Sequence, residues 1–334
     1  MASVPKLEAL NWTEKKVLIT GGTGSFGRKF AEILLRDHRP KKLIVFSRDE
    51  LKQYEMRNHF RDDPTLRFFL GDVRDSARLD RAFDGVDIVI HAAALKQVPT
   101  LEYNPFEAVK TNIVGAENVI NAAVDRGVSR VIALSSDKAV NPVNLYGATK
   151  LCAEKLFIDG NSYAGLKGTR FSIVRYGNVL ASRGSVIPLF RERSKTGVLP
   201  VTDKRMTRFW ITLEQAARFV MHCFEMMLGG EIFVPRIPTM SILDLASVIG
   251  PQCKIEIIGI RPGEKLHEVL ISSHEARNTV ALENFFMIQP EFHWWVRDNI
   301  WQKGNPVADN FEYSSDKNDR TLTRQELTEM LEKL

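Results

Sequence analysis

A glycine-rich segment near the start of the chain constrains its fold more than any other feature. The segment reads TGGTGSFG over residues 20–27, and it follows an apolar run at 16–19 that is typical of a buried strand. The apolar residues of 26–36 then recur at helical spacing. In open α/β folds, a strand, a glycine-rich turn and a helix form a dinucleotide site, because the backbone can approach a pyrophosphate at the helix N-terminus. Glycines alone mark many turns, so it is this order of elements that predicts a dinucleotide site.

The first half of the chain alternates strand and helix patterns. Strands are expected at 16–20, 42–47, 66–70, 87–92, 130–135 and 171–175. Helices are expected between and after them, at 26–36, 50–60, 76–83, 106–126 and 146–159. This alternation predicts a doubly wound α/β fold of the Rossmann type, with a parallel sheet covered by helices on both faces.

The pattern changes after Asn178. Helices are expected at 213–227, 242–248 and 321–334, and strands at 231–234 and 254–259. We expect a C-terminal segment to be packed by Trp294, Trp295 and Trp301. The chain is therefore predicted to divide into a dinucleotide-binding domain at 1–177, with a return segment around 205–235, and a smaller α/β substrate lobe at 178–334.

Charge and cysteine usage narrow the class of protein. The formal net charge of +5 is spread along 334 residues, which argues against a nucleic-acid surface and suits an acidic small molecule. The three cysteines are far apart in the sequence, so they suggest neither a metal site nor disulfides and fit a reducing cytoplasm. No signal peptide and no apolar run near the length of a membrane span are found. We expect a cytoplasmic protein without a membrane or nucleic-acid partner.

The end of the second expected strand indicates which dinucleotide binds. Ser47 and Arg48 stand there, ahead of the acid Asp49. A hydroxyl beside a guanidinium suits a ribose 2′-phosphate, so NADP is favoured over NAD, and Lys52 would add charge. The alternative is a surface Arg–Asp pair at a strand end. After the third strand, Asp72 is placed to accept from the adenine amino group.

The chemical centre is expected after the fifth strand. The sequence SSDK at 135–138 follows that strand directly, where ligands of open α/β sheets lie. Tyr146 and Lys150 are four residues apart and share a helix face. An ammonium beside a phenol lowers the pKa of the phenol, which makes Tyr146 a candidate base for a hydroxyl proton. The alternative for Asp137 and Lys138 is a polar loop with an N-cap and a surface lysine.

Several further motifs carry a resemblance to a known family. They are SRDELKQ (47–53), HAAALKQVP (91–99), SSDKA (135–139), NLYGATK (144–150), RYGNV (175–179), RMTRFW (205–210) and IRPGEKLHE (260–268). With TGGTGSFG, they resemble the inverting UDP-N-acetylglucosamine 4,6-dehydratases of the extended short-chain dehydrogenase/reductase superfamily. The match runs from about 16 to 315, and these enzymes open the pseudaminic acid pathway of bacterial flagellin and surface glycans.

The resemblance implies a mechanism and a set of catalytic residues. Tyr146, helped by Lys150, would remove the C4 hydroxyl proton while a hydride passes to NADP. Lys138 would take the C5 proton, and Asp137 would protonate the leaving C6 hydroxyl. Return of the hydride to C6 and protonation of C5 from the opposite face would give a UDP-4-keto-6-deoxy-L-arabino-hexosamine. The reaction is that of a lyase, without net redox change.

The resemblance also implies the binding residues and the assembly. The expected cofactor contacts are Gly21, Thr23, Gly24, Ser25, Phe26, Gly27, Ser47, Arg48, Lys52, Asp72, Val73, Ala92, Lys96, Tyr146 and Lys150. The expected contacts with UDP-N-acetylglucosamine are Lys96, Lys138, Asn178, Val179, Arg205, Arg208, Arg261 and Glu264. The three arginines are candidates for the pyrophosphate, and the glutamate for the ribose. No metal is expected, and the family suggests a homo-oligomer, often a hexamer.

Three alternatives stay open. A nucleotide-sugar 4-epimerase needs the tyrosine and the lysine but no acid at C6, so Asp137 and Lys138 favour dehydration. Capsule and O-antigen 4,6-dehydratase/5-epimerases often carry Met where Tyr146 stands, which favours the pseudaminic branch. The third alternative is an NADP-binding regulator without catalysis, against which the presence of all four catalytic candidates argues.

Overall fold

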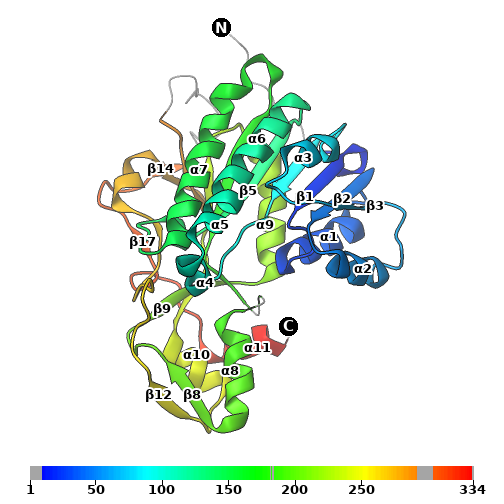
Figure 1. The fold of residues 1–334 in the computed structure, drawn as a ribbon. Coiled ribbons are helices and arrows are strands. Elements are labelled where there is room, and N and C mark those ends of the chain that lie inside the picture. The colour runs from blue at the N-terminus through cyan, green and yellow to red at the C-terminus, as the bar shows by residue number, and fades with distance from the viewer. Residues whose placement is uncertain (1–9, 181, 183, 292–303, 333–334) are drawn as a thin grey trace.

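A ten-stranded sheet organises this computed structural model, which describes residues 10–180, 182, 184–291 and 304–332. The order of its strands is β16-β14-β15-β10-β6-β5-β4-β1-β2-β3. Figure 1 shows the sheet and its helices in the upper part of the molecule, with a smaller lobe below. Within the described ranges, no helix is long and apolar enough to cross a bilayer.

Seven neighbouring strands of the large sheet run parallel. They are β1 (Lys16–Thr20), β2 (Lys42–Ser47), β3 (Leu66–Leu70), β4 (Ile88–His91), β5 (Arg130–Ser136), β6 (Arg170–Tyr176) and β10 (Ile232–Pro235). Side chains on both faces of the central strands are buried, as in Val17, Leu18 and Ile19. Parallel sheets need this cover, which explains why central strands such as β1 and β4 read as nearly continuous apolar runs. The predicted doubly wound α/β fold is confirmed.

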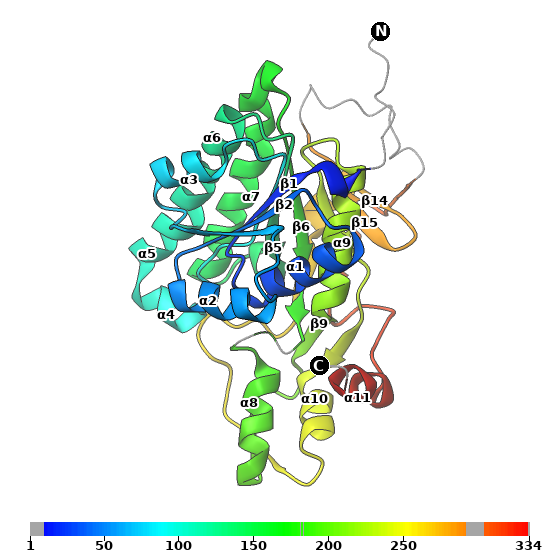
Figure 2. The ribbon, with the colours of Figure 1, turned by 90° about the vertical axis from the view of Figure 1, so that its right-hand side faces the viewer.

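Helices cover both faces of the sheet, as Figure 2 shows. One face carries α1 (Ser25–Asp37) and α9 (Leu213–Met226), which pack against each other. The other carries α3 (Ser76–Ala82), α5 (Pro105–Val109), α6 (Gly115–Asp125) and α7 (Leu145–Ala164), while α2 (Glu50–His59) follows β2. The start of α9 is set by Thr212, whose side chain and that of Gln215 form a capping box. The expected helices are confirmed, nearly all within a few residues, and the helix expected at 146–159 continues to Ala164.

The helix expected at 106–126 is confirmed in its bounds, but a π-helical turn interrupts it. The structure has α5, a π-helical turn at Lys110–Val114 and α6, and a further helix, α4 (Val98–Tyr103), precedes them. The wide turn places the Asn112 side chain where it bonds both the N–H and the carbonyl of Leu95, at 2.8 and 2.9 Å. A local bond pattern of this kind leaves no trace in apolar spacing, so periodicity could not reveal it.

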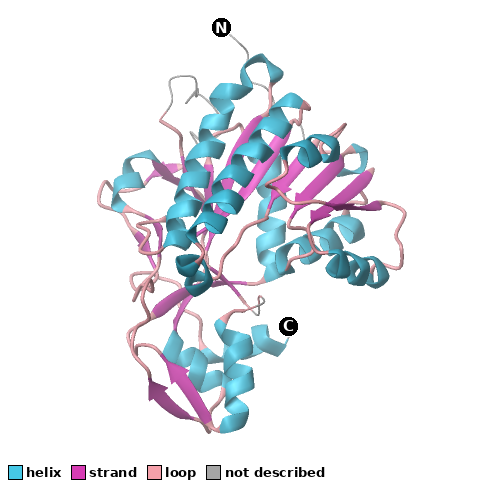
Figure 3. Cartoon of the chain, viewed as in Figure 1, coloured by secondary structure: helices cyan, strands magenta, loops and turns pink. Residues whose placement is uncertain are grey.

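The smaller lobe is built from short elements around its own core. It holds a sheet of β7 (Asn178–Val179), β9 (Thr207–Ile211) and β11 (Thr239–Ser241), and a parallel pair of β8 (Val198–Val201) and β12 (Lys254–Ile257). Its helices are α8 (Val186–Arg193), α10 (Ile242–Ile249) and α11 (Arg324–Glu332). Figure 3 shows the paired strands flanked by these helices. Trp210, Phe190 and Leu245 are fully buried in its core.

The second half of the chain also extends the large sheet. Strands β15 (Phe285–Ile288), β14 (Thr279–Ala281) and β16 (Asn305–Pro306) add to β10 in antiparallel pairings. A separate antiparallel pair joins β13 (Val269–Ile271) to β17 (Tyr313–Ser314). The division of the chain into two domains at 177/178 stays a prediction. The tryptophans expected to pack the C-terminal segment, Trp294, Trp295 and Trp301, lie outside the described residues.

Candidate active site

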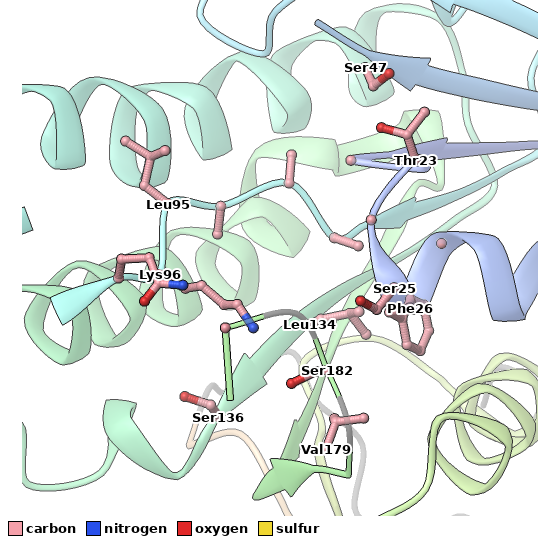
Figure 4. A pocket seen from close by; sticks show the side chains of 18 of the residues that line it. Thr23, Ser25, Phe26, Ser47, Leu95, Lys96, Leu134, Ser136, Val179 and Ser182 are labelled. Atoms are coloured by element: carbon pink, nitrogen blue, oxygen red, sulfur yellow. The ribbon is translucent and has the colours of Figure 1, made fainter. Parts of the chain in front are cut away.

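A cavity of about 840 Å³ opens at the carboxyl ends of the parallel strands. Figure 4 shows Thr23, Ser25 and Phe26 on one side of it and Ser136, Val179 and Ser182 on another, with the Lys96 side chain extending between them. Open α/β sheets bind their ligands at this edge, where the order of the strands reverses. The cavity joins the expected dinucleotide site to the expected chemical centre.

Most of the predicted site residues line this one cavity. They include every expected cofactor contact and all four catalytic candidates, together with Asn178 and Val179. Four expected substrate contacts do not line it: Arg205, Arg208, Arg261 and Glu264. The roles of all these residues stay predictions.

The glycine turn has the geometry that a pyrophosphate requires. Gly21 has a φ of 65°, and a Cβ there would lie 2.8 Å from backbone atoms of Ala93. A Cβ on Gly27 would meet the Gly22 carbonyl oxygen at 2.4 Å. Gly24 is the N-cap of α1 and carries no side chain to cap it. The N-terminus of α1 therefore faces the cavity with its positive dipole end open to an anion.

Two buried hydroxyls in the cavity wall support the fit of a dinucleotide. Thr111 and Ser135 are each 5% exposed and line the cavity. Within the part of the chain that the structure describes, neither Oγ atom has a hydrogen-bond partner. Buried polar groups normally pair, so these hydroxyls suit a ligand with polar atoms. Neither hydroxyl was among the expected contacts, although Ser135 lies within the motif SSDKA at 135–139.

The end of the cavity near β2 carries several cations. Ser47 is held by Gln53, whose Nε2 donates to the Ser47 carbonyl and Oγ, both at 3.0 Å. Arg48 is 53% exposed at its side chain, and its Nη1 lies 3.6 Å from Asp72 Oδ2. Lys52 forms an ion pair with Asp49. Arg28 also lines the cavity and was missed by sequence reasoning.

Asp72 is engaged by the protein itself. Its carboxylate accepts from the backbone N–H of Arg74 at 3.0 Å and from Arg74 Nη2 at 2.8 Å. Burial opposes ionisation, but the bonds from Arg74 and the charge of Arg48 outweigh it and lower the pKa of Asp72. Its expected bond to the adenine amino group stays a prediction, and it would have to share these oxygens.

Tyr146 and Lys150 differ from expectation in how they interact. Burial raises the pKa of Tyr146, and the groups that oppose this are the Ser136 hydroxyl and the Lys138 ammonium. Lys150 Nζ instead donates to the Leu134 carbonyl at 2.6 Å. Burial, partly offset by Glu154, lowers the pKa of Lys150 to about 8. Lys150 is not among the groups that shift the pKa of Tyr146 here, and its expected help to the phenol stays a prediction.

A buried histidine stands behind the lysine. His91 Nδ1 lies 2.8 Å from Thr20 Oγ1, and the ring is 2% exposed. Burial, followed by the charge of Lys150, lowers the pKa of His91 to about 3. The imidazole is therefore neutral at physiological pH and contributes no cation beside Lys150.

Asp137 and Lys138 form an ion pair at the cavity. Lys138 Nζ lies 3.0 Å from Asp137 Oδ1, and the aspartate is 1% exposed. Asp137 Oδ2 has no hydrogen-bond partner among the described residues. Burial raises the pKa of Asp137 against the opposing charge of Lys138. Burial disfavours the charged lysine, but Asp137 and Glu268 outweigh it and raise the pKa of Lys138.

The arginines expected at the pyrophosphate have other partners. Arg208 is 7% exposed, and its guanidinium donates to the carbonyls of Thr207, Leu266 and Lys265. Arg205 is exposed and pairs with Asp203 at 2.8 Å. A buried guanidinium whose N–H groups already bond carbonyls is poorly placed to bind a ligand, whereas the exposed one can exchange its partner.

Comparison with known proteins places these features in a family. The profile of a family described as "Polysaccharide biosynthesis protein" matches residues 17–290. A protein from Campylobacter jejuni subsp. jejuni serotype O:2, named UDP-N-acetylglucosamine 4,6-dehydratase (inverting), is 52% identical over 96% of this chain and 98% of its own. A UDP-glucose 4-epimerase from Rickettsia canadensis is 41% identical over 96% of each chain.

Solved structures give the same picture of the fold. Pen from Bacillus thuringiensis superimposes with a TM-score of 0.88 at 38% identity, over 97% of this chain and 100% of that one. The dTDP-glucose 4,6-dehydratase DesIV from Streptomyces venezuelae, with NAD and TYD bound, gives 0.67 at 24% identity over 75% and 86% of the two chains. At 24% identity, the similarity to DesIV supports only the assignment of the fold.

Proposed function

The chain belongs to the polysaccharide biosynthesis protein family, and on that premise we propose that it is an inverting UDP-N-acetylglucosamine 4,6-dehydratase. The observation that carries the proposal is the Asp137–Lys138 ion pair, which lines the same cavity as Tyr146 and the glycine turn. An acid and a base beyond the tyrosine are what removal of water from a sugar requires. The name of the Campylobacter relative supports the same activity.

The proposed dinucleotide is NADP. The glycine turn and the start of α1 would hold its pyrophosphate, and Ser47, Arg48 and Lys52 would hold its 2′-phosphate. Bound there, the cofactor would accept a hydride from C4 of the sugar and return it to C6. The choice of NADP rests on Arg48, whose guanidinium is exposed at the cavity rather than buried among protein partners.

The residues of the chain would move the protons. Tyr146 would remove the proton of the C4 hydroxyl, and Ser136, which bonds the phenol, would orient it. The resulting ketone acidifies the C5 proton, and Lys138 would accept that proton. Asp137 would donate to the leaving C6 hydroxyl from Oδ2, the oxygen left without a protein partner among the described residues. Net chemistry is the loss of water, which is a lyase reaction.

The remaining features of the proposal follow the same resemblance. Lys96, Asn178 and Val179 line the cavity and would contact the nucleotide sugar. Arg205, Arg261 and Glu264 are kept as substrate candidates outside the cavity wall. Arg208 would have to release the carbonyls that it bonds to join them. We place the enzyme in the cytoplasm, as a homo-oligomer, at the start of pseudaminic acid synthesis. Its three cysteines are free thiols, which suits a reducing compartment.

A product assay tests the proposal. Purified protein incubated with UDP-N-acetylglucosamine in D₂O, without added cofactor, should give a 4-keto-6-deoxy sugar with deuterium at an inverted C5. Lys138→Ala should abolish this product, whereas Lys155→Ala, at an exposed lysine of α7, should not change it. A product that kept the C5 configuration, or gained no deuterium there, would overturn the proposal.

A nucleotide-sugar 4-epimerase is the second candidate, favoured by the name of the Rickettsia relative. The same assay separates the two, because an epimerase gives a 4-hydroxy product of unchanged mass. A regulator that binds NADP without catalysis would give no product at all. Mass spectrometry followed by proton NMR of the product therefore distinguishes all three.

A further inference from the structure

A buried carboxylate that the mechanism does not use lies directly behind the catalytic lysine. Glu268 Oε1 is 2.8 Å from Lys138 Nζ, and its side chain is 1% exposed. Glu268 is not among the described residues that line the cavity. It therefore faces the lysine from the side away from the substrate, as the last residue of the motif at 260–268.

The backbone of Glu268 is fixed on both sides. Its N–H donates to Ser315 Oγ at 2.9 Å, and its carbonyl accepts from the Ser315 N–H at 2.8 Å. These bonds lie beside the pairing of β13 with β17. The carboxylate is thus held by a rigid part of the second half of the chain against a lysine of the first half.

Two more cations surround this carboxylate. Arg208 Nε lies 3.6 Å from Oε1, and Lys265 Nζ lies 3.8 Å from Oε2. Arg208 is tied to three carbonyls, and Lys265 donates to the Val140 carbonyl. Burial opposes ionisation of Glu268, but Lys138 and Arg208 outweigh it and hold its pKa below the ordinary value. Glu268 therefore stays ionised at a buried position from which water is largely excluded.

We propose that Glu268 is a positioning residue for Lys138: its carboxylate holds the lysine at the cavity and supplies the negative charge beside which Nζ regains a proton during catalysis. The inference rests on the proposed dehydratase function. It gives the motif at 260–268 a role in the proton chemistry.

The proton balance shows why such a charge is needed. At rest the pair is an ammonium and a carboxylate, so Lys138 must first pass a proton to Asp137. The neutral amine then takes the C5 proton while the C5–C6 double bond forms. The C6–O bond breaks as Asp137 returns its proton to the leaving hydroxyl, which departs as water. Lys138 is again an ammonium and Asp137 a carboxylate, and Glu268, ionised throughout, stabilises the positive charge that develops on Nζ.

Removing the negative charge of Glu268 should shift the pH dependence of activity in one direction, which follows from the surrounding groups. The charged and titratable groups that face Lys138 and Glu268 are Asp137, Tyr146, Arg208 and Lys265. The charge of Glu268 raises the pKa of both Lys138 and Asp137. Without it the pair loses its shared proton at lower pH, so the fall of activity on the alkaline side moves to lower pH.

Glu268→Gln tests this in the full-length protein. We expect kcat to fall about a hundredfold, because a lysine released by Glu268 is misplaced relative to the C5 proton, with KM nearly unchanged because Glu268 does not line the cavity. The alkaline limb of the kcat profile should move down by about one to three pH units. Glu268→Asp, which keeps the charge but shortens the side chain, should keep the limb in place and recover part of kcat.

Glu275→Gln is the matched control. It removes a carboxylate that pairs with the buried Arg175 and does not contact Lys138. It should lower stability without moving the alkaline limb. If Glu268→Gln does not fold, as judged by NADP binding and circular dichroism, Glu268→Asp carries the test through its reduced kcat and unmoved limb.

A direct titration separates this inference from the proposed function. The pKa of Lys138 Nζ, followed by NMR of isotope-labelled lysine and assigned with Lys138→Ala, should fall in Glu268→Gln by about one to three units whether or not the protein turns over. An unchanged pKa, or a Glu268→Gln variant as active as the wild type, overturns the role of Glu268. A wild type that forms no dehydrated sugar overturns the proposed function instead.

Discussion

Replacing Arg175 should damage the protein more than most single substitutions, for reasons visible in its surroundings. Arg175 stands near the end of β6 and is 1% exposed. Nε and Nη2 donate to Glu154 at 3.1 and 2.7 Å, and Nη1 and Nη2 donate to Glu275 at 3.2 and 3.0 Å. Nη1 also donates to the Leu270 carbonyl at 2.9 Å. All five N–H groups of the guanidinium are therefore used.

Arg175→Met keeps most of the side-chain volume and leaves two carboxylates without their cation. Glu154 is 2% exposed at its side chain, so its charge would be buried and uncompensated. Removing one partner of a buried ion pair costs about 3–5 kcal/mol of unfolding free energy. Arg175→Lys, which keeps the charge but loses the fork, should cost less. Glu154→Gln leaves Arg175 and Glu275 as an ion pair whose charges balance, so it should also lower the free energy of unfolding by less.

The loss of unfolding free energy in Arg175→Met should depend on pH. Burial opposes ionisation of Glu275, but Arg175 outweighs it and lowers the pKa of Glu275. The stabilisation is thus present above the unfolded pKa of about 4.3 and disappears as pH falls through the folded value. In Arg175→Met the two carboxylates can become neutral by taking up protons. The deficit in unfolding free energy relative to the wild type should therefore shrink at lower pH.

Urea denaturation of wild type and variant at about pH 8 and about pH 5.5 measures both effects. We expect the full deficit at the higher pH and a smaller one at the lower. A deficit below about 1 kcal/mol would show that the network does not carry the stability assigned to it. A deficit equal at both pH values would show that charge is not the cause.

Three further predictions concern the cavity. Arg48→Ala should weaken NADP binding about tenfold or more and leave NAD binding nearly unchanged, because it removes a bond to a charged phosphate; equal losses in a fluorescence titration would contradict the NADP assignment. Gly27→Ala should cost about 1–3 kcal/mol and weaken dinucleotide binding, since its Cβ would meet the Gly22 carbonyl oxygen at 2.4 Å; a stable variant with normal affinity would show that the turn can yield. Tyr146→Phe should lower kcat about 10²–10⁴-fold while UDP-N-acetylglucosamine still binds, and a rate within about tenfold of wild type would remove the tyrosine from the proton path.

The sequence best predicts those parts of the site that are formed by residues close together in the chain. The strand at 16–20, the glycine turn and the start of α1 are neighbours in the chain, so their geometry follows from a short stretch of residues. Buried parallel strands such as β1 and β2 have the bounds expected from the sequence, because both of their faces need apolar side chains. The motifs that end those strands identify the expected cofactor and catalytic residues of the cavity, although not Arg28 or Thr111.

What the sequence did not reveal depends on contacts between distant segments. Nothing in the spacing of IRPGEKLHE indicates that Glu268, rather than Glu264, reaches Lys138. The bond from Lys150 to the Leu134 carbonyl depends on how α7 packs beside β5, which apolar periodicity does not specify. Arg175 reads as a polar end to a strand, and its burial is explained only by the two carboxylates that meet it in three dimensions.

The π-helical turn at Lys110–Val114 makes chain length itself a constraint. A π-helical turn holds one residue more than an α-helical turn over nearly the same rotation, so deleting one residue here would restore ordinary α-helical geometry and leave α6 close to its present register. The change would fall on Asn112, which would be displaced from Leu95, whereas Gly115 would keep its close approach to Val73, where a Cβ would lie 2.8 Å from Cγ2. A relative that shortens this helix by one residue must rebuild the loop after β4 as well. At this place both the number of residues and the identity of Asn112 are constrained.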